Sequence, residues 1–320
     1  MKKIIFSLFI IFILLGCQKN ESISLALDWY PNSNHAGIYS AIDEGFFQEE
    51  KIDFEVYTPS DPTAIISAVA SGRDEFGLSY HPDILQAQSA GLNIISVLSI
   101  AQHPLNSIMT LKENNISNPK DLKGKTIGFP GIPSNKAMLE TVLNNQGLDI
   151  NDVETVDVGF ELVKALISGS VDAIIGAYWT HESIVMELQG YEIDVMRLEE
   201  WGVPDYYELI LITNTNFLIE NKSEVEKVVE SITKGYKFAI KNPEKSIDSV
   251  INIAGKEIVE EDVERKGIEL LIPMWESKSI KFGFQDIEKW EETYNWMNDN
   301  NFLEKELKIE DLFFSEFSNN

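Results

Sequence analysis

The sequence predicts an α/β protein made of two doubly wound lobes that face each other across a cleft. From residue 23 onward, short apolar runs alternate with segments of helical spacing, and this rhythm is typical of a parallel sheet flanked by helices. The rhythm pauses at His103-Pro104 and again at Gly202-Val203-Pro204. These pauses predict a middle lobe, 105–208, inserted into a first lobe made of 23–104 and 209–320.

The apolar runs and helical patterns place each element in order. In the first lobe we expect strands at 23–27, 52–57, 76–79 and 94–100, and helices at 36–50, 63–70 and 83–90. In the middle lobe we expect strands at 107–111, 126–129, 153–158 and 173–175, and helices at 135–145 and 161–167. A strand at 209–213 returns to the first lobe, followed by helices at about 222–241, 243–253, 260–271 and 285–298.

A weak internal repeat supports two lobes of similar design. The run 71–80 resembles the run 168–178, with one insertion. In both, a helix ends at glycine, a short turn with an acidic residue follows, and a strand ends in tyrosine, at Tyr80 and Tyr178. Because ligands bind beyond the carboxyl ends of strands in open α/β sheets, these two tyrosines are expected to face one cleft from opposite lobes.

The first residues form a processing signal. Lys2 and Lys3 precede an apolar run at 4–15, which is too short for a comfortable membrane span and fits a signal peptide, 1–16. Leu14-Leu15-Gly16-Cys17 resembles a bacterial lipobox, so we expect Cys17 to carry a lipid and 17–22 to form a tether. The alternative is a plain signal peptide with a chance cysteine. The expected location is exported, anchored to the outer face of the cytoplasmic membrane, or to its periplasmic side if an outer membrane exists.

Composition excludes several function classes. The formal net charge is −26, and no basic stripe is visible, which argues against a nucleic-acid partner. The chain has one cysteine, so no intrachain disulfide can form and stability must come from the core. The hydrophobic fraction of 44% suits such a core.

Four segments at strand ends or helix starts are rich in flat aromatics and in Asp, Glu, Asn and His. They are 28–37, 79–83, 128–135 and 176–182. Aromatic faces stack on a planar, nitrogen-containing ring, while carboxylates and amides accept or donate hydrogen bonds at its edge. Oxyanion binders favour arginine, and none of the three arginines lies in these segments. The pattern therefore favours a heterocyclic ligand over an anion.

The candidate ligand-binding residues come from these segments and from one further tyrosine. They are Asp28, Trp29, Asn34, His35, Tyr80, His81, Ser134, Tyr178, Glu182 and Tyr206. Each has a structural alternative: Trp29 as packing between lobes, Asp28 as a cap or hinge residue, Glu182 as a first-turn carboxylate, and the histidines as partners of local backbone groups.

Signatures of catalysis and metal binding are weak. The four histidines show no metal-ligand spacing, and no nucleophile elbow, phosphate-binding loop or dinucleotide fingerprint occurs. The sequence therefore predicts a protein that is not an enzyme and that carries neither a metal nor a cofactor.

The run from Leu27 to Gly37, followed by Gly45-Phe46-Phe47, resembles the start of the thiamine-precursor family. That family includes bacterial formylaminopyrimidine-binding proteins and the fungal enzymes that make the thiamine pyrimidine. The runs 76–83, 177–182 and 201–208 are similar to the bacterial binders. The resemblance covers nearly all of the chain after the signal peptide.

This resemblance implies a type II periplasmic-binding-protein fold with a hinge, and an ABC permease and ATPase as partners of a monomeric binder. It also implies that Asp28 and Glu182 hold an aminopyrimidine edge from opposite lobes, with Trp29 and Tyr178 near the ring. The expected ligand is formylaminopyrimidine or hydroxymethylpyrimidine. Riboflavin, thiamine or a small sulfonate or amide is the alternative.

The fungal members make a pyridoxal-phosphate-dependent pyrimidine synthase the third hypothesis. They bind pyridoxal phosphate through a lysine in the segment where this chain has Ser79, and they carry a cysteine-rich run where it has 203–208. Without an amine no Schiff base forms, so these two departures weigh against the enzyme.

Overall fold

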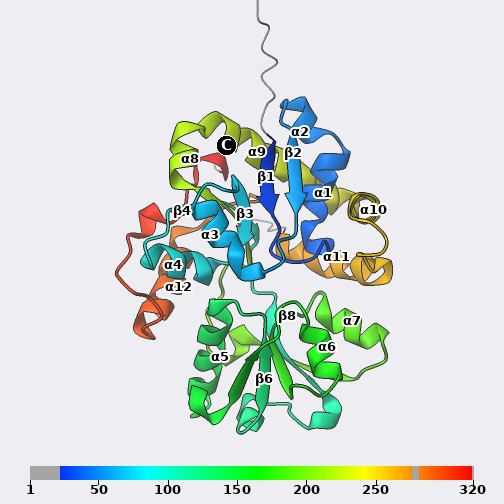
Figure 1. Cartoon of the computed structure of the whole chain (residues 1–320), viewed down its shortest axis with the longest axis vertical. Helices are drawn as coiled ribbons and strands as arrows, with labels where there is room; N and C mark the ends of the chain where they lie inside the picture. Colours follow the sequence, from blue (N-terminus) through cyan, green and yellow to red (C-terminus); the bar gives the residue numbers. More distant parts are fainter. Residues whose placement is uncertain (1–21, 276–280, 319–320) are drawn as a thin grey trace, which may run out of the picture.

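The computed structural model describes residues 22–275 and 281–318, which form two α/β lobes (Figure 1). The middle of the chain, drawn in green, forms one lobe, and the blue N-terminal and yellow-to-red C-terminal parts together form the other. Two connections join the lobes, at 102–105 and 202–208. The predicted signal peptide 1–16, Cys17 and the tether up to residue 21 lie outside the described residues.

The first lobe holds a five-stranded sheet in the order β2-β1-β3-β10-β4. Its strands are β1 (Ile23–Ala26), β2 (Phe54–Tyr57), β3 (Phe76–Ser79), β4 (Ile94–Ala101) and β10 (Leu209–Asn214). β1 runs parallel to β2 and β3, but β10 is antiparallel to both of its neighbours, β3 and β4. The parallel sheet that the sequence predicts therefore contains one antiparallel strand, because the returning strand enters from the side where the parallel strands end.

The second lobe repeats this plan in the order β7-β6-β8-β5-β9. Its strands are β5 (Asn106–Leu111), β6 (Thr126–Phe129), β7 (Glu154–Asp157), β8 (Ala173–Tyr178) and β9 (Ile193–Arg197). β6 pairs in parallel with β7 and β8, whereas β5 is antiparallel to β8 and β9. The edge strand β9 was not predicted, because charged and apolar residues are mixed along it.

Helices cover both sheets. The first lobe contains α1 (Ala36–Asp43), α2 (Phe46–Glu49), α3 (Ile65–Ala70), α4 (His81–Ser89), α8 (Thr215–Glu220), α9 (Lys222–Lys241), α10 (Pro243–Ala254), α11 (Glu261–Trp275) and α12 (Ile287–Asp299). The second contains α5 (Pro133–Asn145), α6 (Leu162–Ile167) and α7 (Glu182–Leu188). The single helix expected at 36–50 is broken, because Gly45 adopts φ = 79° and separates α1 from α2.

The aromatic stripe of α12 lies in the core, as its spacing predicts. Trp290 and Met297 are fully buried with Tyr207, and Tyr294 packs against the same cluster. This confirms that these side chains have a packing role.

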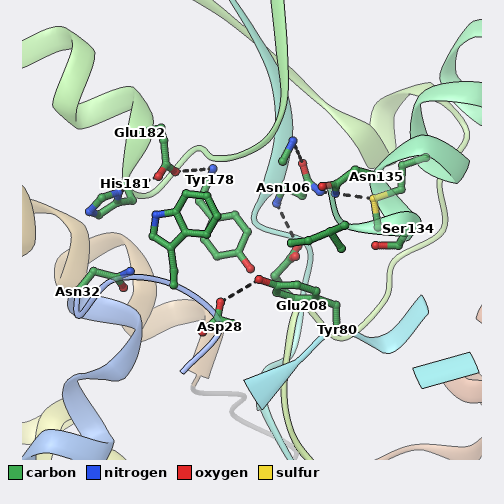
Figure 2. A pocket seen from close by; sticks show the side chains of 14 residues that line it. Asp28, Asn32, Tyr80, Asn106, Ser134, Asn135, Tyr178, His181, Glu182 and Glu208 are labelled. Atoms are coloured by element: carbon green, nitrogen blue, oxygen red, sulfur yellow. Dashed lines mark hydrogen bonds and ion pairs between the residues drawn. The ribbon is translucent and has the colours of Figure 1, made fainter. Parts of the chain in front are cut away.

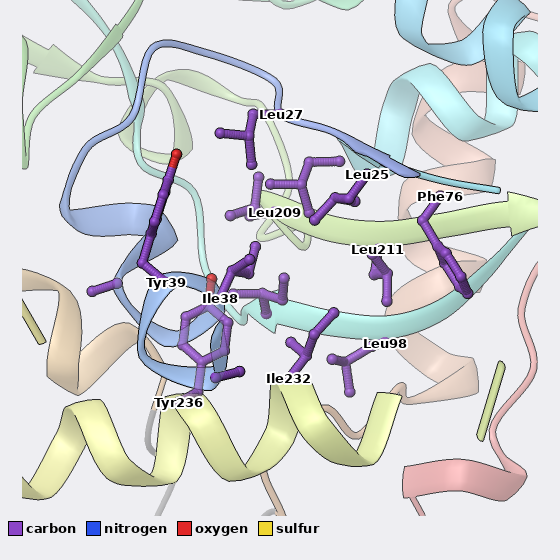
Figure 3. Close-up of a cluster of buried hydrophobic side chains, with 14 of the residues drawn as sticks. Leu25, Leu27, Ile38, Tyr39, Phe76, Leu98, Leu209, Leu211, Ile232 and Tyr236 are labelled. Atoms are coloured by element: carbon purple, nitrogen blue, oxygen red, sulfur yellow. The ribbon is translucent and has the colours of Figure 1, made fainter. Parts of the chain in front are cut away.

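Helix α9 fixes the start of α1 through an unusually close approach. A Cβ atom on Gly235 would lie 2.0 Å from the Gly37 carbonyl oxygen, and one on Gly37 would lie 2.2 Å from the Tyr236 ring. Figure 3 shows Tyr236 beside Ile38 in the main core cluster. The Tyr236 hydroxyl donates to the Asn34 carbonyl at 2.7 Å. The core thereby sets the position of the loop that precedes α1.

We expect Gly235→Ala to lower the free energy of unfolding by about 1–3 kcal/mol, because overpacking against backbone outweighs the roughly 1 kcal/mol gain in helix propensity. Urea denaturation followed by circular dichroism measures this change. Lys237→Ala, an exposed substitution in the same helix, is the control and is expected to have little effect. Equal stability of both variants would show that the two helices can move apart at little cost.

Candidate functional site

A cavity lies between the lobes, where the parallel strands of both sheets end (Figure 2). It encloses about 460 Å³, part of it open to solvent. Asp28 and Trp29 follow β1, Tyr80 follows β3, and Tyr178 ends β8. The wall is completed by Asn32, Asn106, Ile132, Ser134, Asn135, Met138, Gly176, His181, Glu182 and Glu208.

Asp28 is buried and held by two donors from its own lobe. Its Oδ1 lies 2.8 Å from His35 Nε2, and its Oδ2 accepts from the Tyr80 hydroxyl at 3.0 Å. The Asn32 backbone N–H donates to His35 Nδ1 at 3.2 Å, which assigns the proton of a neutral ring to Nε2. Burial and the Asp28 carboxylate raise the pKa of Tyr80 well above its ordinary value, so the Tyr80 hydroxyl remains a donor.

The loop that carries Asp28 is fixed by local capping. Asn32 caps the 3₁₀ turn Ser33–His35: its side chain accepts from the Asn34 N–H at 2.8 Å, while His35 reaches back to the Asn32 backbone. Such a reciprocal cap satisfies donors that would otherwise be buried unpaired. The imidazole of His35 thus orders the loop on one side and orients Asp28 on the other.

Glu182 begins α7 and links the second lobe to the first through His181. Its Oε2 accepts from the Tyr178 backbone N–H at 2.8 Å, and its Oε1 lies 3.0 Å from His181 Nδ1. The other ring nitrogen, Nε2, lies 3.1 Å from Oε1 of Glu264 on α11. Glu264 Oε2 in turn accepts from the Ser33 backbone N–H at 2.6 Å. A continuous chain of hydrogen bonds therefore crosses from lobe to lobe.

His181 carries the positive charge in this series of hydrogen bonds. Burial alone would lower its pKa, but the carboxylates of Glu182 and Glu264 raise the pKa of His181 well above the ordinary value. Each ring nitrogen faces a carboxylate oxygen, which is the geometry of an imidazolium that donates twice. The positive charge of His181 is therefore already paired with two carboxylates of the protein.

Glu208 lies at the hinge, where the two connections between the lobes meet. Its Oε2 accepts from the backbone N–H groups of Leu105 at 2.7 Å and Asn106 at 3.0 Å, and from the Tyr206 hydroxyl at 2.9 Å. Burial raises the pKa of Glu208 to about 7, although the hydrogen bonds from Leu105, Asn106 and Tyr206 act to lower it. Glu208 thus brings a carboxyl group to the cavity floor and ties both connections together.

A second contact between lobes joins Asp83 of α4 to Ser134 of α5. The Ser134 hydroxyl donates to Asp83 Oδ2 at 2.6 Å, and the Ser134 N–H donates to Oδ1 at 3.3 Å. Beside it, Asn135 is 4% exposed, and its Oδ1 has no hydrogen-bond partner among the described residues. Ser134 and Asn135 both line the cavity, whereas Asp83 lies behind Ser134.

Aromatic side chains form the apolar walls. Trp29, Tyr80 and Tyr178 line the cavity, and Trp29 meets Phe160 of the opposite lobe edge-on at 4.6 Å between ring centroids. Tyr30 contacts the same phenyl ring at 4.8 Å. Phe160 therefore closes the outer side of the site against the first lobe.

Six of the ten predicted site residues line the cavity: Asp28, Trp29, Tyr80, Ser134, Tyr178 and Glu182. The other four do not. Asn34, His35 and Tyr206 lie behind the wall, where they hold the loop, Asp28 and Glu208, respectively. His81 lies in the core, 3.9 Å from the Trp290 ring, and burial lowers its pKa well below the ordinary value.

The sequence reasoning missed eight lining residues. They are Asn32, Asn106, Ile132, Asn135, Met138, Gly176, His181 and Glu208. Most of them lie inside the four segments that the sequence analysis identified, so their position beside the predicted residues could have indicated them. Asn106, Met138 and Glu208 carried no such signal, because the fold alone brings the hinge and α5 to this cavity.

Two further features are absent from the described residues. Residues 22–275 and 281–318 contain no group of three or more His, Cys, Asp or Glu side chains arranged to hold a metal ion. Within the same residues, none of the helices combines the length and apolar character that a bilayer span requires.

Known structures share this fold. The alkanesulfonate-binding protein SsuA from Xanthomonas axonopodis pv. citri superposes with a TM-score of 0.73 at 15% identity, covering 92% of this chain and 98% of that chain. At this identity the likeness concerns the fold alone, and it confirms the two-lobed periplasmic-binding-protein fold that the sequence predicts.

Sequence relatives show the family. A formylaminopyrimidine-binding protein from Halalkalibacterium halodurans is 36% identical over 98% of both chains. A 4-amino-5-hydroxymethyl-2-methylpyrimidine phosphate synthase from Saccharomyces cerevisiae is 26% identical over 72% of this chain and 70% of its own length. Residues 32–246 match the family described as NMT1/THI5 like. The chain belongs to the NMT1/THI5-like family.

Proposed function

We propose that this chain is the solute-binding component of an ABC importer and captures a thiamine-related aminopyrimidine, formylaminopyrimidine or hydroxymethylpyrimidine. The observation that carries the proposal is the pair of carboxylates, Asp28 and Glu182, presented from opposite lobes into a cavity with aromatic walls. No lysine or arginine is among the described residues that line this cavity.

The two carboxylates suit the edge of an aminopyrimidine. Each oxygen of Asp28 and Glu182 accepts one hydrogen bond from the protein, and a carboxylate oxygen has capacity for a second. The amino and formylamino N–H groups of the ligand are donors that match this capacity. Trp29 and Tyr178 supply flat faces for the ring, which gain from stacking beyond simple burial.

Capture would involve closure of the lobes around the ligand. Contacts that cross between the lobes include His181 with Glu264, Asp83 with Ser134, Trp296 with Thr141, and the Phe160 ring with Trp29 and Tyr30. An opening motion about the two connections would break such contacts and expose the cavity.

We propose a binding role and not catalysis. Formation of a Schiff base with pyridoxal phosphate requires an amine at the end of β3, where this chain has Ser79, a buried hydroxyl. A relative that matches nearly the full chain is named as a binding protein, whereas fungal synthases of the family match 71% to 78% of it. No cofactor is included in the proposal.

The proposed setting is the outside of the cytoplasmic membrane. A lipid on Cys17 would anchor a monomeric binder there, beside the permease and ATPase that would take up its ligand. The predicted signal peptide and lipobox support this setting.

Calorimetric titration tests the proposed ligand class. We expect a one-site isotherm with formylaminopyrimidine or hydroxymethylpyrimidine, accompanied by a change in total tryptophan fluorescence as the ring covers the Trp29 indole. Thiamine, riboflavin and a small sulfonate are the competing ligands. Binding of the sulfonate alone would exclude a pyrimidine carrier, and a pyridoxal phosphate absorbance band in the purified protein would revive the enzyme hypothesis.

We expect Asp28→Asn and Glu182→Gln each to weaken pyrimidine binding by about 1–3 kcal/mol, because each leaves a ligand donor facing an amide group in a buried site. Calorimetry against the wild type measures the loss. Glu187→Gln is the matched control, since Glu187 is exposed on the same helix as Glu182. Unchanged affinity in both site variants would remove these two carboxylates from the ligand contacts.

Replacement of Cys17 by alanine tests the anchor. We expect the wild type to enter the detergent phase of a detergent partition with a lipid mass on the intact protein, and the variant to lack that mass, because the thiol that would carry the lipid is gone. The control is the circular-dichroism spectrum of the full-length variant, which should match the spectrum of the wild type. A wild-type protein that already partitions into the aqueous phase would contradict lipidation.

A further inference from the structure

Asp83 occupies a position that normally attracts ligand anions. Helix α5 spans thirteen residues, starts with Pro133, and has no side-chain cap from its own N-cap residue, Ile132. The first N–H groups of such a helix carry partial positive charge and bind anions. Here Asp83, reaching over from the other lobe, accepts from both the N–H and the hydroxyl of Ser134.

The start of α5 faces the ligand cavity. Ser134 and Asn135 both line the cavity, and Figure 2 shows them on its wall beside Asn106. The buried Asn135 Oδ1 has no partner within the described part of the chain. An oxygen without a partner is a second, independent sign that a ligand contacts this end of the helix, and it calls for a donor there and not for an anion.

We propose that Asp83 is a specificity-determining residue that fills the anion position at the start of α5 and makes the cavity reject anionic ligands, the phosphate monoester of the pyrimidine among them. The pyrimidine part of this inference depends on the proposed function. The anion part depends only on the geometry of Asp83 and α5.

The charges around the cavity act in the same direction. Asp28, Glu182 and Glu208 line it, and the cation among the lining residues, His181, is already paired with two carboxylates. Lys136, in the first turn of α5, is exposed to solvent and is not among the residues that line the cavity. An anion at Ser134 would therefore meet carboxylates and no unpaired cation among the described lining residues, and such repulsion is strong where water is excluded.

Asp83 itself carries charge under ordinary conditions. Its side chain is 4% exposed, and burial raises the pKa of Asp83 to about 6, against the hydrogen bonds from Ser134 that lower it. The carboxyl group is therefore mostly ionised near pH 8. A ligand phosphate would have to displace this carboxylate from Ser134 or lie beside it.

The names of the relatives show why discrimination between neutral and phosphorylated pyrimidines would matter. One relative is named for binding formylaminopyrimidine, which has no phosphate, and others are named as synthases of a hydroxymethylpyrimidine phosphate. The names within one family thus refer to a neutral pyrimidine in one case and to a phosphorylated one in the other. A residue that closes the anion position would adapt this chain to the neutral form.

The test compares hydroxymethylpyrimidine with its phosphate monoester by calorimetry at pH 8, using the full-length protein. We expect the wild type to prefer the neutral compound by roughly 100-fold. Asp83→Ala opens the anion position, and Asp83→Asn removes the charge but keeps the shape. Both are expected to reduce the preference by about tenfold or more, mainly through tighter binding of the monoester.

The ratio of the two affinities separates specificity from structure. If Asp83 only held the lobes together, its variants would weaken both ligands equally and leave the ratio unchanged, which would overturn the proposal. Equal binding of both compounds by the wild type would overturn it as well. Glu304→Gln removes an exposed charge from an adjoining pocket that Asp83 also lines, leaves the hydrogen bond from Ser134 to Asp83 in place, and is expected to leave the ratio unchanged.

Titration with inorganic phosphate distinguishes failure of the proposed function from failure of the proposal on Asp83. If the wild type binds neither pyrimidine, the proposed function fails, and phosphate binding then decides the role of Asp83. Tighter phosphate binding to Asp83→Ala than to the wild type would preserve the anion-exclusion role. No gain in phosphate binding would overturn that role.

Discussion

Buried carboxylates are the constraint that shapes the rest of this protein. Asp28, Glu182, Glu208 and Asp83 lie in or beside one cavity, and each is nearly inaccessible to water. An ionised carboxylate out of water is costly unless protein donors replace the water. Imidazole, phenol, hydroxyl and backbone N–H groups supply those donors here. The loops that carry the donors must therefore be rigid, and their rigidity comes from the core beneath them.

The hinge is part of the same arrangement. Glu208 binds the backbone N–H groups of Leu105 and Asn106, so one buried carboxylate joins the two connections on which the lobes would turn. A second link lies nearby, where Asp205 contacts His103 at 2.9 Å and Lys289 at 2.8 Å. These contacts fasten the two connections to each other and to α12.

The sequence predicted the parts of this design that are local. Strand and helix periods indicated two α/β lobes, and residue type at strand ends indicated Asp28, Trp29, Tyr80 and Tyr178. What it could not predict are contacts between distant segments. Ser134 and Asp83 are 51 residues apart in the sequence, and His181 and Glu264 are 83 residues apart. Neither contact produces a periodic pattern that the sequence could reveal. The antiparallel direction of β10 was missed for the same reason, since the path of a crossover is not encoded in the strand that follows it.

The balance of charge also links ligand binding to closure. When the lobes meet, carboxylates from both sides are brought together, and His181, already shared between Glu182 and Glu264, compensates only part of their charge. In the proposed function, repulsion among the remaining carboxylates would favour an open arrangement when the cavity holds only water. A ligand that donates hydrogen bonds to Asp28 and Glu182 would satisfy acceptors in both lobes at once, and this benefit would exist only when the lobes are closed. The acidic cavity would thereby select a donor-rich ligand and make closure depend on that ligand's presence.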